Sequence, residues 1–250
     1  MCEMRQPMTR RDMLSGCLCL FFTSLCPFRR ADGKGWMDKT GKGIHVNLPG
    51  PIFDGTCSLE KTIKNRRTIR SFKEKSLSLD QLSQLLWAAQ GITEEHGFKR
   101  SAPSAGALYP IDLYLVVGTD ALREVEPGVY RYAPRNHTLF GVIRGDLRRD
   151  LARASLSQMW MAKAPVSFVI TAEYARATRK YKRRGVRYTL IEAGHVGQNI
   201  FLQAEALSLG AGIIGAFDDK GIVRIMNISQ KHEPLLIMPV GYKDYESPVS

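Results

Sequence analysis

Two short segments carry residue types that could bind a flat ligand bearing a phosphate. Residues 66–72 (RRTIRSF) hold three arginines and two hydroxyls. Guanidinium groups bind phosphate oxygens in pairs, and hydroxyls donate to the remaining oxygens. Residues 101–110 (SAPSAGALYP) are mostly small, so their backbone can approach a flat ring closely. Either segment alone could be a surface turn or a tight loop, whereas the pair in this order favours a flavin mononucleotide.

A third glycine-rich segment, residues 210–215 (GAGIIG), matches the GxGxxG pattern by letter. A dinucleotide site needs these glycines after a strand and before a helix, so that the helix N-terminus meets the pyrophosphate. Apolar periodicity here predicts the reverse order, with a long helix over 188–209 ended by Gly210 and a strand over 213–217. We therefore expect no Rossmann site. A nicotinamide cofactor would visit only as a substrate.

The remaining elements indicate where these segments are positioned. Ser78 and Gln81 form a capping box before a helix that Gly91 ends, and further helices are predicted over 58–64 and 146–157. Strands are predicted over 111–117, 165–172 and 235–240, with two more within 128–140. Helices and strands mix without regular alternation, which favours an α+β fold. The ordered domain is predicted to cover residues 58–250, and residues 29–57 are predicted to be a flexible linker.

The N-terminus predicts export. Arg10 and Arg11 precede an apolar stretch over 13–28, which is the layout of a twin-arginine signal. A fortuitous basic and apolar start is the alternative. Residues 1–28 are thus predicted to be an export signal or anchor that engages the twin-arginine machinery. The protein would be periplasmic or membrane-tethered on the outer side of the cytoplasmic membrane, and whether the signal is cleaved, lipidated or retained stays open.

Charge and cysteine usage narrow the function classes. The net charge is +12, and many of the basic residues lie in 176–187. Such a run could bind nucleic acid or another polyanion. We expect a solvated loop or cofactor rim instead, because no recognised nucleic-acid motif accompanies it. Only Cys57 of the five cysteines lies beyond residue 26, and the histidines show no ligand spacing, so no disulfide or metal site is expected in the domain.

The ordered set of motifs resembles the nitroreductase superfamily. The two segments above are followed by residues 188–199 (YTLIEAGHVGQN), 214–219 (IGAFDD) and 239–242 (PVGY). The likeness spans about residues 58–243 and is greatest to the SagB-type dehydrogenase branch, which includes azoline oxidases. The resemblance implies a three-layer α+β sandwich with a mostly antiparallel central sheet. It also implies a homodimer with FMN at the subunit interface and two-electron chemistry at flavin N5.

The resemblance also implies roles for particular residues. Arg66 and Thr68 match phosphate binders, and Arg70 matches the basic residue near flavin N1 and O2, where a cation favours the reduced form. Residues 103–107 match the loop along the ring, and residues 215–216 match the turn whose backbone faces N5. The predicted cofactor-binding set is Arg66, Arg67, Thr68, Arg70, Pro103, Ser104, Ala105, Gly106, Ala107, Gly215, Ala216 and, from the C-terminal end, Lys243.

Lys180 and Tyr181 match the pair that azoline oxidases use as acid–base groups. A lysine acts as a base at neutral pH only when burial or like charges lower its pKa, and the basic run supplies like charges. The alternative is a solvated lysine beside a packing tyrosine. His195 is expected to be a core histidine, with a catalytic role as the alternative. Asp218 and Asp219 are expected to begin a solvated helix, with a role on the substrate side as the alternative.

The predicted function is an FMN-dependent oxidoreductase that transfers a hydride between flavin N5 and an organic substrate, either a small molecule or a peptide. One alternative is an NAD(P)H-dependent reductase of nitro compounds or quinones, with NAD(P)H as a transient donor. Two further alternatives are a flavin-binding protein without turnover and a polyanion binder. No nucleic-acid partner is expected.

Overall fold

The computed structural model of the protein describes Trp36 and residues 43–244. All of the described residues belong to one compact unit. The predicted export segment, 1–28, lies outside the described residues. Among the helices that are described, none is both long enough and apolar enough to cross a membrane.

A seven-stranded sheet forms the centre of this unit, in the order β1-β4-β3-β2-β5-β7-β6, and each neighbouring pair is antiparallel. Every residue of β2 and β5 is buried, since helices cover both faces of the sheet there. The strands are β1 (His45–Asn47), β2 (Ile111–Val117), β3 (Gly128–Ala133), β4 (Thr138–Arg144), β5 (Val166–Ala172), β6 (Leu209–Ala211) and β7 (Glu233–Tyr242).

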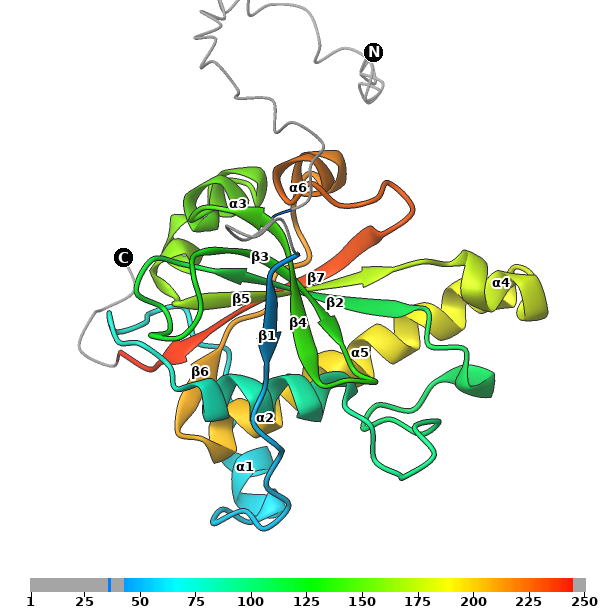
Figure 1. The fold of residues 1–250 in the computed structure, drawn as a ribbon, viewed down its shortest axis with the longest axis horizontal. Helices are drawn as coiled ribbons and strands as arrows, with labels where there is room; N and C mark the ends of the chain where they lie inside the picture. Colours follow the sequence, from blue (N-terminus) through cyan, green and yellow to red (C-terminus); the bar gives the residue numbers. More distant parts are fainter. Residues whose placement is uncertain (1–35, 37–42, 245–250) are drawn as a thin grey trace, which may run out of the picture. The chain divides into compact units, whose positions relative to one another are not determined.

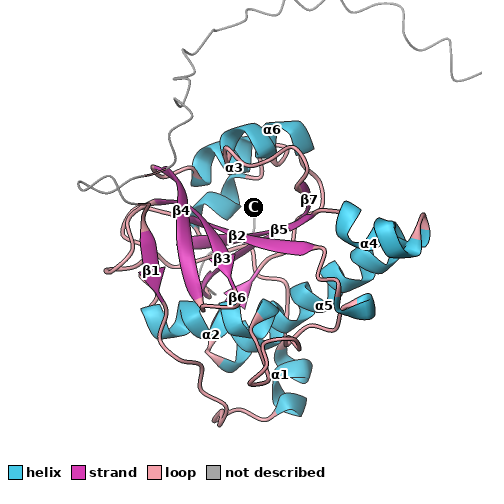
Figure 2. Cartoon of the chain, turned by 45° about the vertical axis from the view of Figure 1, so that its right-hand side comes forward, coloured by secondary structure: helices cyan, strands magenta, loops and turns pink. Residues whose placement is uncertain are grey.

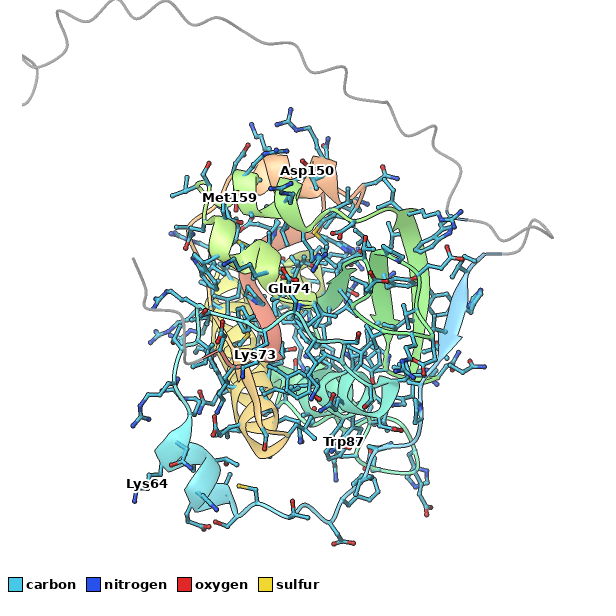
Figure 3. All side chains as sticks on the ribbon, turned by 90° about the vertical axis from the view of Figure 1, so that its left-hand side faces the viewer. Lys64, Lys73, Glu74, Trp87, Asp150 and Met159 are labelled. Carbon is cyan, nitrogen blue, oxygen red and sulfur yellow. The ribbon has the colours of Figure 1, made fainter. Side chains whose placement is uncertain are left out.

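Helices form a layer on each side of the sheet (Figures 1 and 2). One layer contains α1 (Leu59–Asn65), α2 (Leu79–Gln90) and the long α5 (Arg184–Ala206). The other contains α3 (Arg148–Ala154), the 3-10 helix η2 (Met159–Lys163) and α6 (Asp219–Ile225). Figure 3 shows Trp87 of α2 on one side of the sheet and Asp150 and Met159 on the other. The predicted three-layer α+β architecture is therefore confirmed.

The start and the packing of helix α2 both follow from its local sequence. The Ser78 hydroxyl accepts from the Gln81 N–H at 3.1 Å, and the Gln81 Oε1 accepts from the Ser78 N–H at 3.0 Å, as the capping box predicted. Leu82, Leu85 and Leu86 are fully buried in the core shared with α5 and the sheet. Burial of such a side chain contributes about 1.5–3 kcal/mol, so packing fixes α2 against α5.

The prediction of an unstructured linker over 29–57 is wrong for part of that segment. Trp36 is buried and packs on Tyr130 with ring centroids 5.0 Å apart. Strand β1 pairs with β4, His45 lying opposite Phe140. These contacts come from residues distant in the chain, so local composition did not reveal them.

The region after α5 also differs from expectation. The helix ends at Ala206, and Gly210 lies within β6 rather than at the helix end. The strand predicted over 213–217 is wrong, because only Ile214 forms a bridge there, with Ile237 of β7. A helix nevertheless precedes the glycines and α6 begins only at Asp219, so this is not the strand–glycine–helix order of a dinucleotide fingerprint.

The basic run over 176–187 was predicted to be a solvated loop or a cofactor rim, and the prediction of a loop is wrong. It forms most of α4 (Ala175–Tyr181) and the first turn of α5, with Lys182 between them at a φ of +52°. Helix α4 is short and carries few apolar residues, so the sequence shows no apolar periodicity that would predict it. As a result Lys180 and Tyr181 occupy the last turn of a helix.

Candidate functional site

The arginine segment lies along the edge strand β6. Thr68 pairs with Ala211 in a parallel bridge, and the Ile69 N–H donates to the Ala211 carbonyl at 2.9 Å. A Cβ added at Gly212 would lie 2.8 Å from the Trp160 ring and 2.9 Å from the Ile69 carbonyl oxygen. The glycine is therefore needed for this close approach, which brings the arginine segment beside the chain leading to residues 215–216.

Aromatic rings orient two of the predicted cofactor-binding arginines. The Arg66 Cζ lies 5.0 Å from the centroid of the Phe201 ring, and the Arg70 Cζ lies 6.0 Å from that of Trp160. Neither guanidinium has an ion-pair partner among the described residues. Their hydrogen-bond donors are thus available to an anion. Trp160 was not predicted as a site residue, because η2 is far from either motif in the chain.

Two other predicted binders are engaged elsewhere. The Arg67 Nη1 donates to the carbonyl oxygens of Lys64 and Arg66, both at 2.8 Å, at the C-terminal end of α1. The Lys243 Nζ lies 2.6 Å from Glu205 in a largely buried ion pair. The cofactor roles of Arg67 and Lys243 stay predictions, and these contacts do not support them.

The predicted N5 turn is open. Gly215 and Ala216 are exposed, and a Cβ added at Gly215 would meet nothing within 4 Å. The Gln158 Nε2 lies 3.5 Å from the Ala216 carbonyl oxygen, which ties the turn to η2. We call Arg66, Thr68 and Arg70, with Gly215 and Ala216, the arginine cluster.

The second predicted segment forms a strained loop around the 3-10 helix η1 (Ala105–Ala107). Gly106, Ala107 and Tyr109 have φ values of +61°, +51° and +47°. Non-glycine residues in this region cost on the order of 1 kcal/mol or more each, so other contacts must hold the loop. Ser104 supplies two of them, since its hydroxyl donates to Glu192 at 2.5 Å and accepts from the Tyr109 N–H at 2.9 Å.

Glu192 lies on α5 and is only 2% exposed. Burial raises the pKa of its carboxyl to about 7, although the hydrogen bond from Ser104 and the charges of Arg100 and Arg176 act in the opposite direction. Its role was not predicted. The available signal was an acid placed among the small and apolar residues of a long helix, which holds one other acid, Glu205.

Lys180 and Tyr181 lie directly against the predicted flavin loop. A Cβ added at Gly106 would lie 2.5 Å from the Tyr181 Oη and 3.1 Å from the Lys180 Nζ. The Lys180 Nζ lies 5.3 Å from the centroid of the Tyr181 ring, whose edge in turn faces Tyr188. Lys180 is exposed and Tyr181 half-buried. We call Ser104–Ala107, with Lys180 and Tyr181, the loop cluster.

Both clusters rest on α5, at different levels. The loop cluster meets this helix at Glu192 and the arginine cluster meets it at Phe201. Nine residues of helix separate these points, which corresponds to about 13 Å along the axis. The structure thus gathers most of the predicted residues into two groups within one chain, and leaves Arg67, Pro103 and Lys243 outside them.

The N-terminal half of α5 presents an apolar stripe to solvent. Val186, Leu190 and Ile191 are 38%, 50% and 49% exposed. The prediction that His195 is a core histidine is wrong, because it is exposed, one turn beyond Ile191. The prediction for Asp218 and Asp219 is confirmed, since both are exposed and Asp218 is the N-cap of α6.

The residues of the two clusters fit a flavin mononucleotide. Arg66 and Arg70 have guanidinium groups without an ion-pair partner in the described part of the chain, which suits its phosphate and the electron-rich end of its ring. The backbone at Gly215 is open to a ring edge, and at Gly106 no Cβ stands between the loop and Tyr181. The fit depends on both clusters, because the arginines alone would bind any phosphate.

The fold belongs to the class of α+β sandwiches that have a helical layer on each face of an antiparallel sheet. The nitroreductase family model matches residues 63–242, and the chain belongs to this family. Proteins of the family generally bind flavin. The predicted resemblance to the family is confirmed.

Two curated relatives illustrate the range of the family. The chain is 44% identical over 189 residues to MJ1384 of Methanocaldococcus jannaschii, which is named provisionally as a nitroreductase; the match covers 74% of this chain and 91% of that protein. It is 28% identical over 174 residues to the microcin B17-processing protein McbC of Escherichia coli, covering 67% of this chain and 63% of McbC. The predicted likeness to the SagB-type branch is thus confirmed.

Solved structures also support the assignment to the nitroreductase family. A crystal structure from Ralstonia eutropha, titled provisionally as a nitroreductase, superposes with a TM-score of 0.71 at 26% identity and covers 88% of this chain and 98% of that one. A chain of the Escherichia coli microcin synthetase McbBCD complex with truncated pro-MccB17 gives a TM-score of 0.63 at 25% identity, covering 77% and 76%.

Proposed function

We propose that the protein is an FMN-dependent oxidoreductase of the SagB type that transfers a hydride between an organic substrate and flavin N5. The observation that carries the proposal is the contact of Lys180 and Tyr181 with Gly106, in the loop predicted to lie along the flavin ring. Two groups able to exchange protons are thereby placed beside a loop that suits the redox cofactor.

Each cluster would have its own task. Arg66 and Thr68 would hold the phosphate of FMN, and Arg70 the end of the ring at N1 and O2. Residues 215–216 would present backbone to N5. Bound FMN supplies two-electron chemistry, which protein side chains cannot provide.

Lys180 and Tyr181 would move the protons of the reaction. When two adjacent atoms of the substrate are oxidised to a double bond, one hydrogen leaves as a hydride and the other leaves as a proton, and one of these side chains would take the proton. Groups of this kind contribute about 10²–10⁴-fold to rate when they are within hydrogen-bond reach of the proton. Their shared position against Gly106 allows either to act.

The relatives bear on the substrate class. McbC is named for microcin B17 processing, and TfxB of Rhizobium leguminosarum for trifolitoxin processing. We extend this to the present chain as a peptide substrate, with the oxidation of an azoline ring to an azole as the reaction. A small organic molecule is the alternative substrate, favoured by the stronger match to MJ1384.

The active form in this proposal is a homodimer. The apolar stripe of Val186, Leu190 and Ile191 is exposed on α5, the helix that both clusters contact. Burying such a stripe against a second copy removes apolar area from water. A second copy would also bring its loop cluster beside the arginine cluster of the first, which joins the two parts that one chain holds about 13 Å apart along α5.

We also propose export through the twin-arginine route. The support is the sequence alone, in which Arg10 and Arg11 precede the apolar stretch over 13–28. Replacing both arginines by lysine should leave the protein in the cytoplasm of the producing cell. Localisation of the double variant outside the cytoplasmic membrane would contradict this route.

Purification with identification of the cofactor by mass tests the central proposal. We expect a yellow protein with about one FMN per chain. Colourless, folded dimer that does not take up added FMN would overturn it. Anaerobic mixing with NADPH then separates the alternatives, since bleaching of the flavin favours a nitro or quinone reductase. If the protein binds flavin but turns over no donor or acceptor, the remaining interpretation is a flavin-binding protein without turnover.

A further inference from the structure

A cavity of about 580 Å³ opens where β2 and β3 separate. The two strands pair only from Tyr114 opposite Arg131 onward, so residues 111–113 of β2 have no partner on β3. Instead these residues and residues 131–135 form two walls of the cavity. Its volume lies within the range of about 300–1,000 Å³ that is typical of small-molecule sites. No lining residue belongs to the arginine cluster or the loop cluster.

Positive charge dominates the lining. Arg100, Arg131, Arg135 and Arg176 line the cavity, whereas Asp112 is the one acid that does. Both oxygens of Asp112 are already used, one by Arg131 and the other by Arg176, each at 2.6 Å. Asp112 therefore leaves the charges of Arg100 and Arg135 uncompensated.

Arg100 is the more informative of these two residues. Its Nη1 donates to the neutral Gln90 Oε1 at 2.9 Å, and its Cζ lies 4.1 Å from the centroid of the Tyr109 ring. It forms no ion pair among the described residues, and burial lowers its pKa. A partly buried cation without a carboxylate partner is unfavourable, and an anion in the cavity would offset that cost.

A cation in this region is disfavoured. Asp112, Glu173 and His232 place possible ligand atoms within 4.8 Å of one another, yet both carboxylates are in ion pairs with Arg176. A metal ion would have to displace this guanidinium and would face Arg131 as well. The charge balance thus selects an anion.

We infer that the cavity between β2 and β3 binds a small organic anion through a carboxylate or phosphate group, with Arg100 and Arg135 as its main contacts. Guanidinium forks bind both groups in a bidentate manner. This site is additional to the flavin clusters. It is also connected to them, because Arg176 donates to the Tyr109 carbonyl at 3.1 Å and lies one turn before Lys180 on α4.

Titration calorimetry on the full chain, saturated with FMN so that the arginine cluster is filled, tests the site. Succinate and inorganic phosphate are the two probes, at concentrations up to about 10 mM and low ionic strength. We expect at least one to bind, and the tighter one identifies the group recognised. Arg100→Gln and Arg135→Gln should each weaken binding at least tenfold. Arg123→Gln removes an exposed arginine outside the cavity and should bind as the wild type does.

Three results would overturn the inference. One is that neither succinate nor phosphate gives a heat of binding. Another is wild-type affinity for the probe in the Arg135→Gln variant. Arg135 is exposed, so this variant should fold even if Arg100→Gln does not. The last is loss of binding in Arg66→Gln with full binding in Arg100→Gln and Arg135→Gln, which would place the anion in the arginine cluster.

Discussion

The arginine cluster and the loop cluster rest on the same helix but are built in opposite ways. In the arginine cluster, Arg66 and Arg70 lie over aromatic rings and have no ion-pair partner among the described residues. In the loop cluster, Ser104 is hydrogen-bonded to a buried glutamate, and Tyr181 packs against Gly106. Free donors suit binding, whereas groups with restricted positions suit proton transfer. The contrast predicts that changes in the first cluster affect affinity and changes in the second affect turnover.

The largest expected effect is on turnover. Lys180→Ala should lower kcat by about 10²–10⁴-fold while FMN content is unchanged, because the ammonium lies at the loop and not among the arginines. Steady-state kinetics with a substrate found by screening, together with the flavin absorbance per chain, measure both quantities. Arg179→Ala is the matched control, since it removes the neighbouring charge on α4. Equal losses in the two variants would mean that general charge, not Lys180, supports the reaction.

A smaller effect is expected on cofactor affinity. Arg66→Ala combined with Arg70→Ala should weaken FMN binding by about 100-fold or more, since each charge-assisted contact contributes about 1.5–3 kcal/mol. Fluorescence titration of the flavin-free protein measures the Kd. Arg67→Ala should change it little, because Arg67 donates to carbonyl oxygens at the end of α1. A loss of affinity in Arg67→Ala as large as in the double variant would contradict the division of roles.

The sequence predicted elements whose signals are local. The capping box of Ser78 and Gln81 marked the start of α2, and the apolar run over 111–117 matched β2. Local signals failed where the partners are remote. Strand β1 forms because it pairs with β4, and α4, which has few apolar residues, packs on the start of α5 through Ala177 and Tyr181.

In the candidate site, too, some features could be predicted from local sequence and others depend on residues far apart in the chain. Residue types predicted Arg66, Arg70 and Gly106, because phosphate and ring binding require particular donors and a bare backbone. The aromatic support of Arg70 by Trp160 and the hydrogen bond between Ser104 and Glu192 could not be predicted, because each joins residues about 90 apart. The apolar letters of α5 also did not show which face is exposed, so His195 was assigned to the core.

A third change should alter the loop cluster through backbone geometry. Gly106→Ala places a Cβ 2.5 Å from the Tyr181 Oη at a φ of +61°, so the loop, Tyr181 or both must move. We expect a loss of about 2–3 kcal/mol in unfolding free energy and a fall in turnover. Gly97→Ala is the control, because Gly97 has a φ of +70° but an added Cβ would meet nothing within 4 Å. Urea denaturation measures the unfolding free energy of both variants. Equal losses in the two would show that backbone strain alone, not crowding of Tyr181, is responsible.

The smallest expected effect concerns pH and the buried acid behind the loop. The pKa of Glu192 is raised from 4.5 to about 7, so the folded protein favours the protonated form. Its stabilising contribution is complete below the unfolded pKa and is lost as pH rises through about 7. We expect the free energy of unfolding to fall by about 1–2 kcal/mol between these limits, less than the full shift implies because the structure relaxes.

Glu192→Gln sharpens this test, because the amide can still accept from Ser104 but does not titrate. Urea denaturation of the variant from about pH 5 to pH 8 should show that this decline is absent, whereas Glu124→Gln, an exposed acid, should retain it. A decline of the same size in Glu192→Gln would assign the titration to another group. The loop cluster would then owe its rigidity to Ser104 and Tyr109 without a proton held on Glu192.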